Sequence, residues 1–299
     1  MGEIRCLGFV GYGAMAQRMA GRLRAAGHSV AAFDPGQKGD ELDGVRLVDS
    51  AASLARQVEA VLVAVPADAA LGQSTEESGG IFEGASPGLL LIDFSTVSPD
   101  ASRRLAEQAV SAGLRFVEAP MSGSTPEAET GQLVILAGGT AEDVEAASPI
   151  LEVVGRKVVH VGPAGSGLTM KLAVNGVMAL GMAALAEALA YGIRSGLDRG
   201  LMIDTFSDLV LVSDHHKRKL AMAKEGSFPP QFPTRLMAKD MGLLLADAGK
   251  LGVPMASMAA AAQLFSFAAA EHGDEDYASA MATMERFARV PGKNGKSGS

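Results

Sequence analysis

The sequence predicts a doubly wound α/β domain, then one long helix, then an all-helical domain. Three observations predict this order. In the first half of the chain, short apolar runs typical of buried strands alternate with helical patterns. A glycine-rich entry at 162–167 then leads into a proline-free apolar stretch that ends at 194. Beyond it the apolar spacing is helical throughout, so no further sheet is expected.

Length and composition agree with two domains. The chain has 299 residues, of which 48% are apolar and 20% charged, enough to bury two moderate cores. We expect a first domain at 1–163, a connecting helix at 164–194, a helical domain at 195–291 and a tail at 292–299. The tail sequence PGKNGKSGS is typical of a disordered end or an artificial addition.

Charge and cysteine content exclude several classes of partner. The formal net charge of −8 argues against a nucleic-acid or anionic-membrane surface, so a small molecule is the expected partner. The single Cys6 excludes an internal disulfide, and the N-terminus enters a strand-like run without a signal-peptide pattern, which favours a cytoplasmic location. The apolar run at 251–270 is broken by glycine, proline and polar residues, which favours a core helix over a membrane span.

The first strand ends in a glycine turn. An apolar run at 4–10 is followed by Gly11-x-Gly13-x-x-Ala16, a helical pattern to residue 26 and a second strand at 29–33. In this context the glycines allow a tight turn and the close approach of a pyrophosphate to the helix N-terminus. The pattern therefore predicts a Rossmann dinucleotide site, the alternative being a glycine-rich turn with a solvated acid nearby.

Asp34 follows the second strand, about 20 residues after the turn, where the fold places an acid against the adenosine ribose. Its charge would repel a 2′-phosphate, so it favours NAD over NADP, with Lys38 as the residue that complicates this preference. The predicted cofactor contacts in the first domain are Gly11, Gly13, Ala14, Met15, Asp34, Val65, Pro66 and Thr96.

The later contacts come from the ends of two more strands. Further strand-like runs lie at 60–65, 89–94, 115–119, 132–137 and 157–161, with helical patterns at 51–57 and 99–112. In an open parallel sheet, the carboxyl ends of the strands line the ligand crevice. Val65, Pro66 and Thr96 are therefore expected near the nicotinamide and its ribose, whereas Ser98 before Pro99 predicts a helix N-cap.

The apolar stretch at 162–194 contains one unexpected lysine. Lys171 lies in a segment rich in alanine and glycine, and lysine is rarely buried without a partner. Asn175 lies four residues on, so both side chains project from one helical face. The alternative is a structural lysine paired with a carboxylate.

The second half predicts helices at 200–209, 213–224, 234–251, 255–272 and 277–288. Adjacent His215 and His216 point to different sides of a helix, so no metal site is expected there. We expect a solvated basic face, or one histidine that reaches the substrate. The alanine-rich helix at 255–270 and the long helix offer faces that favour a homodimer or homotetramer.

Three motifs accompany the glycine turn in order. They are Asp93-Phe94-Ser95-Thr96-Val97-Ser98-Pro99, Glu118-Ala119-Pro120-Met121-Ser122-Gly123-Ser124 and Gly165-Ser166-Gly167-x-x-x-Lys171-Leu172-x-x-Asn175. Together with Lys239-Asp240, they resemble the β-hydroxyacid dehydrogenase family over nearly the whole chain. That family includes 3-hydroxyisobutyrate dehydrogenase, tartronate semialdehyde reductase and L-threonate dehydrogenase.

The resemblance implies a role for each motif. Lys171 resembles the catalytic lysine and Asn175 its companion, while Lys239 resembles a residue that closes over the cofactor. Ser122, Gly123 and Ser124 resemble the cradle for a substrate carboxylate. Ser124 stands where a second glycine is usual, and Met121 where valine is more common, so the shape of the pocket differs.

Together these features predict an NAD-preferring oxidoreductase, with NADP as the alternative cofactor, that acts on a small 3-hydroxy acid or on the corresponding semialdehyde. Oxidation of an alcohol needs a nicotinamide, a base and donors that orient the substrate, and a lysine in a low-polarity cleft can serve as that base. An imine reductase shares the fold but usually lacks the lysine. A non-catalytic dinucleotide-binding scaffold would be expected to have lost the lysine or the cradle.

Overall fold

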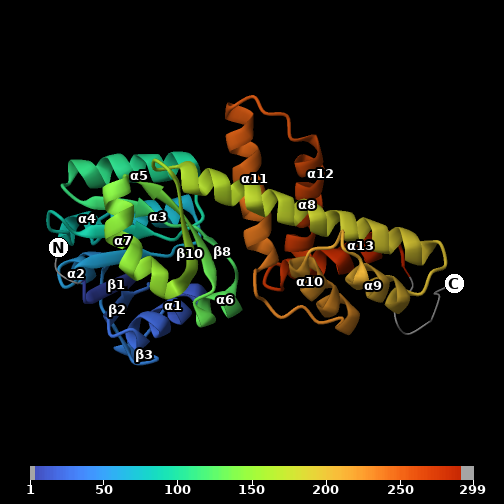
Figure 1. The fold of residues 1–299 in the computed structure, drawn as a ribbon, viewed down its shortest axis with the longest axis horizontal. Helices are drawn as coiled ribbons and strands as arrows, with labels where there is room; N and C mark the ends of the chain where they lie inside the picture. Colours follow the sequence, from blue (N-terminus) through green and yellow to red (C-terminus); the bar gives the residue numbers. More distant parts are fainter. Residues whose placement is uncertain (1–3, 291–299) are drawn as a thin grey trace. The chain divides into compact units, whose positions relative to one another are not determined.

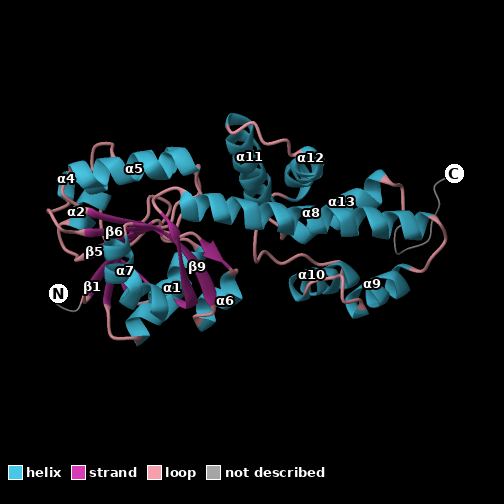
Figure 2. Ribbon diagram, turned by 45° about the horizontal axis from the view of Figure 1, so that its top comes forward, coloured by secondary structure: helices cyan, strands magenta, loops and turns pink. Residues whose placement is uncertain are grey.

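The computed structural model describes residues 4–290, and the predicted tail falls outside them. The chain divides into two compact units, whose boundary lies between Leu172 and Ala173 inside helix α8 (Ser166–Arg194). Each unit is described separately. The first contains the sheet and the second contains helices, as Figures 1 and 2 show.

The first unit follows the predicted alternation. Its elements are β1 (Cys6–Val10), α1 (Ala14–Ala25), β2 (Ser29–Phe33), β3 (Glu41–Leu42), β4 (Val45–Leu47), α2 (Ala51–Ala55), β5 (Ala60–Val63), α3 (Asp68–Thr75), α4 (Ile81–Gly84), β6 (Leu90–Asp93), α5 (Pro99–Ser111), β7 (Arg115–Glu118), β8 (Met121–Ser122), α6 (Thr125–Thr130), β9 (Leu133–Gly139), α7 (Ala141–Val154) and β10 (Gly155–Gly162). All the predicted strands are present. The short strands β3, β4 and β8 were not predicted.

The sheet is mixed rather than wholly parallel. Across the described residues its order is β10-β9-β7-β6-β5-β1-β2-β4-β3, with β8 paired to β9. The strands from β4 to β7 in this order are parallel, as the crossover helices predict. However, β9 is antiparallel to β7 and to β8, because the chain turns back through β8 instead of crossing a sheet face. The predicted parallel sheet is therefore present from β7 to β4, and β9 and β10 extend it while running in the opposite direction.

Helices cover both faces of this sheet. Alternate strand residues such as Leu62 and Val63 enter different apolar clusters, as the strand period of two requires. One cluster includes residues of α1, α6 and α7, and the other includes residues of α2, α3, α4 and α5. The carboxyl ends of β1, β5 and β6 remain at one edge between these layers, where their turns can meet a ligand.

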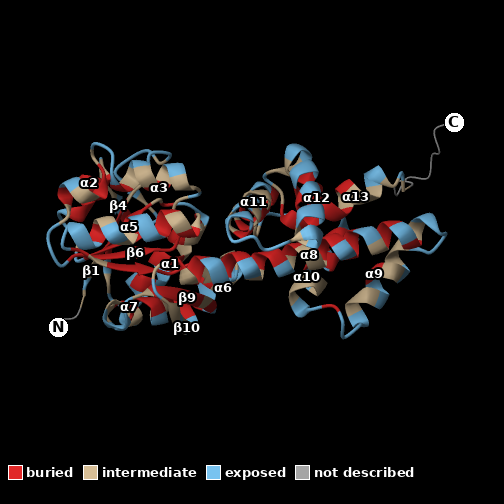
Figure 3. Cartoon of the chain, turned by 90° about the horizontal axis from the view of Figure 1, so that it is seen from above, coloured by how far each residue is buried: buried red, intermediate tan, exposed pale blue. Residues whose placement is uncertain are grey.

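Helix α8 has 29 residues and is roughly 44 Å long at the usual rise of 1.5 Å per residue. Burial varies along α8, as the colours of Figure 3 show. Ala173, Val177 and Tyr191 are exposed, whereas Leu172, Gly176 and Ala190 are buried. By length and composition alone α8 is apolar enough to cross a membrane, but half of its most apolar window is buried inside the protein, as in a core helix.

The second unit is helical, as predicted. After α8 its elements are α9 (Arg199–Asp208), α10 (Asp214–Glu225), α11 (Thr234–Lys250), α12 (Ala256–His272), the 3₁₀ turn η1 (Tyr277–Ser279) and α13 (Ala280–Phe287). Helices α11 and α12 pack against each other, and η1 contacts α10, α11, α12 and α13. The last predicted helix therefore begins with a 3₁₀ turn, which packs against α10, α11 and α12.

Candidate active site

The glycine turn after β1 has the geometry that a dinucleotide site requires. Gly11 has φ +86°, and a Cβ there would lie 2.3 Å from the carbonyl oxygen of Ala64, so only glycine fits. Gly13 precedes α1, and a Cβ on it would meet nothing within 4 Å. No side chain of the described residues caps this helix start, which leaves the first amides, those of Ala14 and Met15, for an anion.

Asp34 is held at the end of β2 by the same turn. Its Oδ2 accepts a hydrogen bond from the backbone N–H of Tyr12 at 2.6 Å, and its Oδ1 accepts one from Gly36 at 2.7 Å. An ionised carboxylate has about four acceptor sites, so it can still accept bonds from ribose hydroxyls. Ala16, 1% exposed, packs in the core below the turn. These residues fit a dinucleotide.

The turns after β5 and β6 are bonded to each other. The N–H of Val65 donates to Ser95 Oγ at 3.0 Å, and Ser98 donates to the Asp68 carboxylate from its N–H at 2.9 Å and its Oγ at 2.6 Å. Ser98 Oγ also accepts from Ala101 N–H, which confirms the predicted N-cap of α5. The two turns thus form one braced edge of the sheet.

The predicted cofactor contacts lie on this edge. Val65 and Thr96 are half-buried and Pro66 is exposed. Asp93, the last residue of β6, is fully buried and accepts a hydrogen bond from the N–H of Ser95 at 2.9 Å. Burial raises the pKa of Asp93 to about 7, against the hydrogen bonds from Ser95 and with the help of the nearby charges of Glu118 and Asp68.

Lys171 and Asn175 both lie on the buried side of α8, 8% and 1% exposed. Asn175 Nδ2 donates to Asp240 Oδ2 at 2.6 Å, and Asp240 Oδ1 lies 3.0 Å from Lys239 Nζ. The amide of Asn175 is thereby oriented, and its Oδ1 has no hydrogen-bond partner among the described residues. Asp240 is 2% exposed and contacts both Asn175 and Lys239.

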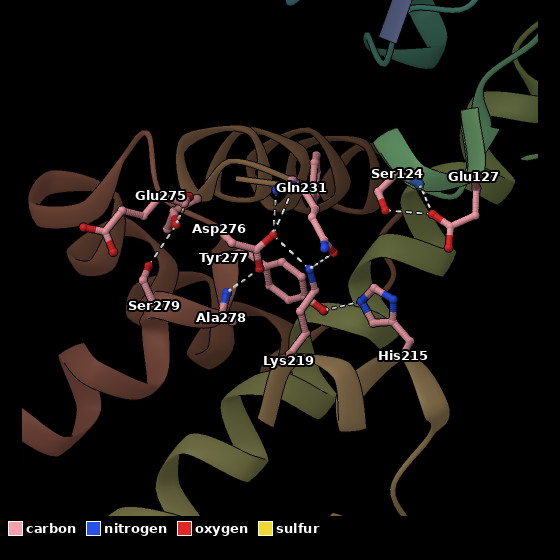
Figure 4. A network of polar contacts seen from close by, with 12 residues as sticks. Ser124, Glu127, His215, Lys219, Gln231, Glu275, Asp276, Tyr277, Ala278 and Ser279 are labelled. Atoms are coloured by element: carbon pink, nitrogen blue, oxygen red, sulfur yellow. Dashed lines mark hydrogen bonds and ion pairs between the residues drawn. The ribbon is translucent and has the colours of Figure 1, made fainter. Parts of the chain in front are cut away.

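The predicted carboxylate cradle lies at the end of β8. Gly123 has φ +129°, and a Cβ there would lie 2.8 Å from Leu133 Cδ2. Ser124 donates to Glu127 Oε2 from both its N–H and its Oγ, each at 2.8 Å (Figure 4). Both donors of Ser124 thus serve a capping box at the start of α6, which the sequence analysis did not anticipate.

A second polar cluster, which the sequence analysis missed, lies inside the helical unit (Figure 4). Lys219 and Asp276 are 1% and 0% exposed and form an ion pair of 2.8 Å. Asp276 Oδ2 also accepts from the N–H groups of Gln231 and Phe232, at 3.1 and 3.0 Å. One buried carboxylate therefore holds the segment before α11 to the turn before α13.

The two adjacent histidines are part of this packing and not a solvated face. His215 Nε2 is 2.6 Å from the Tyr277 hydroxyl, and His216 Nε2 is 3.0 Å from the carbonyl oxygen of Met178. Burial lowers the pKa of His215 to about 4, and the nearby positive charge of Lys219 acts in the same direction. His215 is therefore neutral at physiological pH. Across residues 4–290, no group of three or more His, Cys, Asp or Glu residues is arranged to hold a metal ion.

Comparison with known families covers nearly the whole described chain. The profile of the NAD binding domain of 6-phosphogluconate dehydrogenase matches residues 6–162. The profile described as NAD-binding of NADP-dependent 3-hydroxyisobutyrate dehydrogenase matches residues 165–284. The two matches meet at the start of α8, where the lysine motif begins.

Individual relatives match over nearly their full lengths. A 3-hydroxyisobutyrate dehydrogenase of Pseudomonas aeruginosa is 34% identical over 290 residues, covering 91% of this chain and 96% of the relative. A 2-(hydroxymethyl)glutarate dehydrogenase of Eubacterium barkeri is 31% identical over 298 residues, covering 97% and 98%.

A solved structure supports the same assignment. The 3-hydroxyisobutyrate dehydrogenase of Mycobacterium tuberculosis with L-serine has a TM-score of 0.83 and 27% identity, covering 94% of this chain and 99% of that one. The profiles, the sequence relatives and this structure all agree with the order of motifs along the chain. The chain belongs to the 3-hydroxyisobutyrate dehydrogenase family of NAD(P)-binding 3-hydroxyacid oxidoreductases.

Proposed function

We propose that this protein is an NAD-preferring dehydrogenase that oxidises a small 3-hydroxy acid to its semialdehyde, or catalyses the reverse reduction, with Lys171 as general acid and base. The observation that carries the proposal is the buried lysine on α8, on the same helical face as a buried asparagine. Lysine side chains are rarely buried in proteins unless they are paired.

Lys171 would move the proton. In oxidation its Nζ accepts the proton of the substrate hydroxyl, and in reduction it returns that proton to the carbonyl oxygen. Its charged form stabilises negative charge on the same oxygen. A bound nicotinamide supplies the hydride acceptor or donor.

Asn175 would orient the reacting groups by accepting a hydrogen bond. Its Nδ2 is committed to Asp240, so its Oδ1 is the atom that can accept a hydrogen bond from Lys171 or from the substrate hydroxyl. Lys239, paired with Asp240, is proposed to contact the cofactor. The cradle of Ser122, Gly123 and Ser124 would bind the substrate carboxylate, and an anion would compete with Glu127 for the two donors of Ser124.

The cofactor would lie on the glycine turn, with Gly11, Gly13, Ala14 and Met15 at the pyrophosphate. Asp34 supports the preference for NAD, because its bound carboxylate is fixed in the turn and would repel a 2′-phosphate. We expect kcat/KM to be higher with NAD than with NADP. Comparable values for the two cofactors would contradict this preference.

A substrate screen and one variant test the proposed reaction. NAD reduction is measured with 3-hydroxyisobutyrate, glycerate, threonate and serine, and the best acid is then used with Lys171→Ala. We expect kcat to fall by about 10²–10⁴-fold while the dissociation constant for NADH stays unchanged, because general acid–base catalysis contributes about that factor. Turnover near the wild-type rate with normal cofactor binding would show that Lys171 does not transfer the proton.

We also propose a homodimer or homotetramer in the cytoplasm. Exposed apolar side chains on α8 and α12, among them Val177, Tyr191 and Phe267, support self-association. Light scattering after size exclusion measures the mass directly, and a monomer at micromolar concentration would contradict the proposal. The single unpaired Cys6 supports the location, which cell fractionation tests.

A further inference from the structure

We propose that Glu118 is a positioning residue, which caps the start of α8 from the end of β7 and thereby fixes the place of Lys171. The inference rests on the proton-transfer role proposed above for Lys171. It concerns only residues of the first unit, since Glu118, the first turn of α8 and Lys171 all lie before the boundary at Leu172.

The carboxylate of Glu118 is completely buried and both of its oxygens are used. Oε1 accepts a hydrogen bond from the backbone N–H of Gly167 at 2.6 Å, and Oε2 accepts one from Ser102 Oγ, on α5, at 2.5 Å. Gly167 is the second residue of α8, and its N–H has no carbonyl partner within the helix. An N-cap side chain normally fills this role from the residue that precedes the helix, but here that residue is Gly165.

Two glycines lie close to the Glu118 carboxylate. A Cβ on Gly138 would lie 2.2 Å from Glu118 Oε1. A Cβ on Gly167 would lie 2.2 Å from the carbonyl oxygen of Leu136 and 3.1 Å from the same Oε1. A Cβ atom at position 138 or 167 would therefore clash, so both positions require glycine. Strand β9 and the first turn of α8 thus close directly on the Glu118 side chain.

Helix geometry connects this cap to Lys171. Gly167, Lys171 and Asn175 are spaced by four residues and so share one face of α8. A shift or rotation of the first turn would therefore move the Lys171 side chain, and a displacement of about 1 Å can cost about 10²-fold in rate.

The test compares two substitutions of Glu118. Glu118→Gln keeps an oxygen that can accept from Gly167 and an amide that can pair with Ser102, whereas Glu118→Leu removes both bonds. The matched control is Glu59→Leu, because Glu59 also accepts two backbone N–H bonds, from Arg5 at 2.7 Å and Cys6 at 2.9 Å, far from α8 in sequence. Each variant is assayed for kcat, KM, the NADH dissociation constant and hydrogen exchange of the Gly167 amide.

We expect Glu118→Leu to lower kcat by about tenfold or more and to speed exchange of the Gly167 amide, with KM and NADH affinity within about twofold of wild type. Glu118→Gln should restore kcat to within about threefold, and Glu59→Leu should change neither kcat nor this exchange rate. Wild-type kcat or wild-type exchange in Glu118→Leu would overturn the proposal. Equal losses of kcat in Glu118→Leu and Glu118→Gln would also overturn it. Such a result would mean that the negative charge of Glu118 is needed, and not its hydrogen bond from the Gly167 N–H.

Two further measurements cover a variant that does not fold and a wild-type protein without activity. If Glu118→Leu does not fold, Ser102→Ala removes the hydroxyl that holds Oε2, and it should change kcat and Gly167 exchange in the same direction; no change in either would overturn the proposal. If the wild-type protein turns over none of the hydroxy acids, the proposed function fails. Exchange at Gly167 still decides whether Glu118 caps the helix.

Discussion

Replacing Lys219 by methionine tests how strongly the buried ion pair supports the helical unit. Methionine keeps the apolar stem and removes the ammonium group, which lies 2.8 Å from Asp276 Oδ2 with the two side chains 1% and 0% exposed. The carboxylate would remain buried without its counter-charge. Removing one partner of a buried pair costs about 3–5 kcal/mol. Backbone N–H bonds from Gln231, Phe232 and Ala278 still stabilise Asp276, so we expect about 3 kcal/mol.

The same helix supplies the control. Lys224 on α10 pairs with Asp204, but these side chains are 52% and 57% exposed, so Lys224→Met should cost about 1 kcal/mol or less. Urea unfolding followed by far-ultraviolet circular dichroism gives both values. With a slope of about 1–3 kcal/mol per molar urea, Lys219→Met should lower the midpoint by about 1 M or more.

Equal and small losses in the two variants would refute the reasoning. Asp276→Asn gives a second estimate, because it leaves the ammonium of Lys219 buried beside a neutral amide. The double variant Lys219→Met with Asp276→Asn should lose less stability than the sum of the two single losses, since the second change removes the charge that the first left unpaired.

Three further predictions follow from the buried groups and the glycine turn. Burial lowers the pKa of His215 from 6.5 to about 4, so the unfolded state binds the extra proton and the stability contributed by His215 falls as pH drops through 6.5 towards 4. Between pH 8 and pH 5 wild type should therefore lose about 2 kcal/mol relative to His215→Gln, as measured by urea unfolding of both proteins. Burial raises the pKa of Asp93 from 3.8 to about 7, so the stability that Asp93 contributes falls as pH rises, opposite to the effect of His215. Asp93→Asn should therefore gain stability relative to wild type as pH rises from 4 to 7. A stability difference that does not change with pH would contradict the raised pKa. Gly11→Ala should lower the melting temperature, because its Cβ would lie 2.3 Å from a backbone oxygen. The Cβ of Gly13→Ala would meet nothing within 4 Å, so this variant should keep the melting temperature and weaken NADH binding.

Elements with a clear local signal were predictable. Strands such as β5 and β6 are short apolar runs between turns, and α5 begins with the Ser98 and Pro99 signature. The direction of β9 was not predictable from such signals. It depends on whether the chain crosses a sheet face or turns back through β8, and a two-residue strand has no recognisable pattern.

Polar residues were harder to place than apolar ones. The segment Asp214-His215-His216-Lys217-Arg218-Lys219 has the composition of a solvated face, but Lys219 is buried against a carboxylate 57 residues later in the chain. Glu118 was visible only as part of a motif, because helix-capping rules search the residues next to a helix and this cap comes from 49 residues away.

The sequence by itself determined the fold class, the glycine turn with Asp34, and the shared helical face of Lys171 and Asn175. These features depend on backbone conformation and periodicity, which are properties of neighbouring residues. Only the tertiary structure decided which partner each buried polar group has: Asp240 for Asn175, Asp276 for Lys219 and Gly167 for Glu118. A buried charge must find its partner wherever packing excludes water, and that place is set by segments far apart in the sequence.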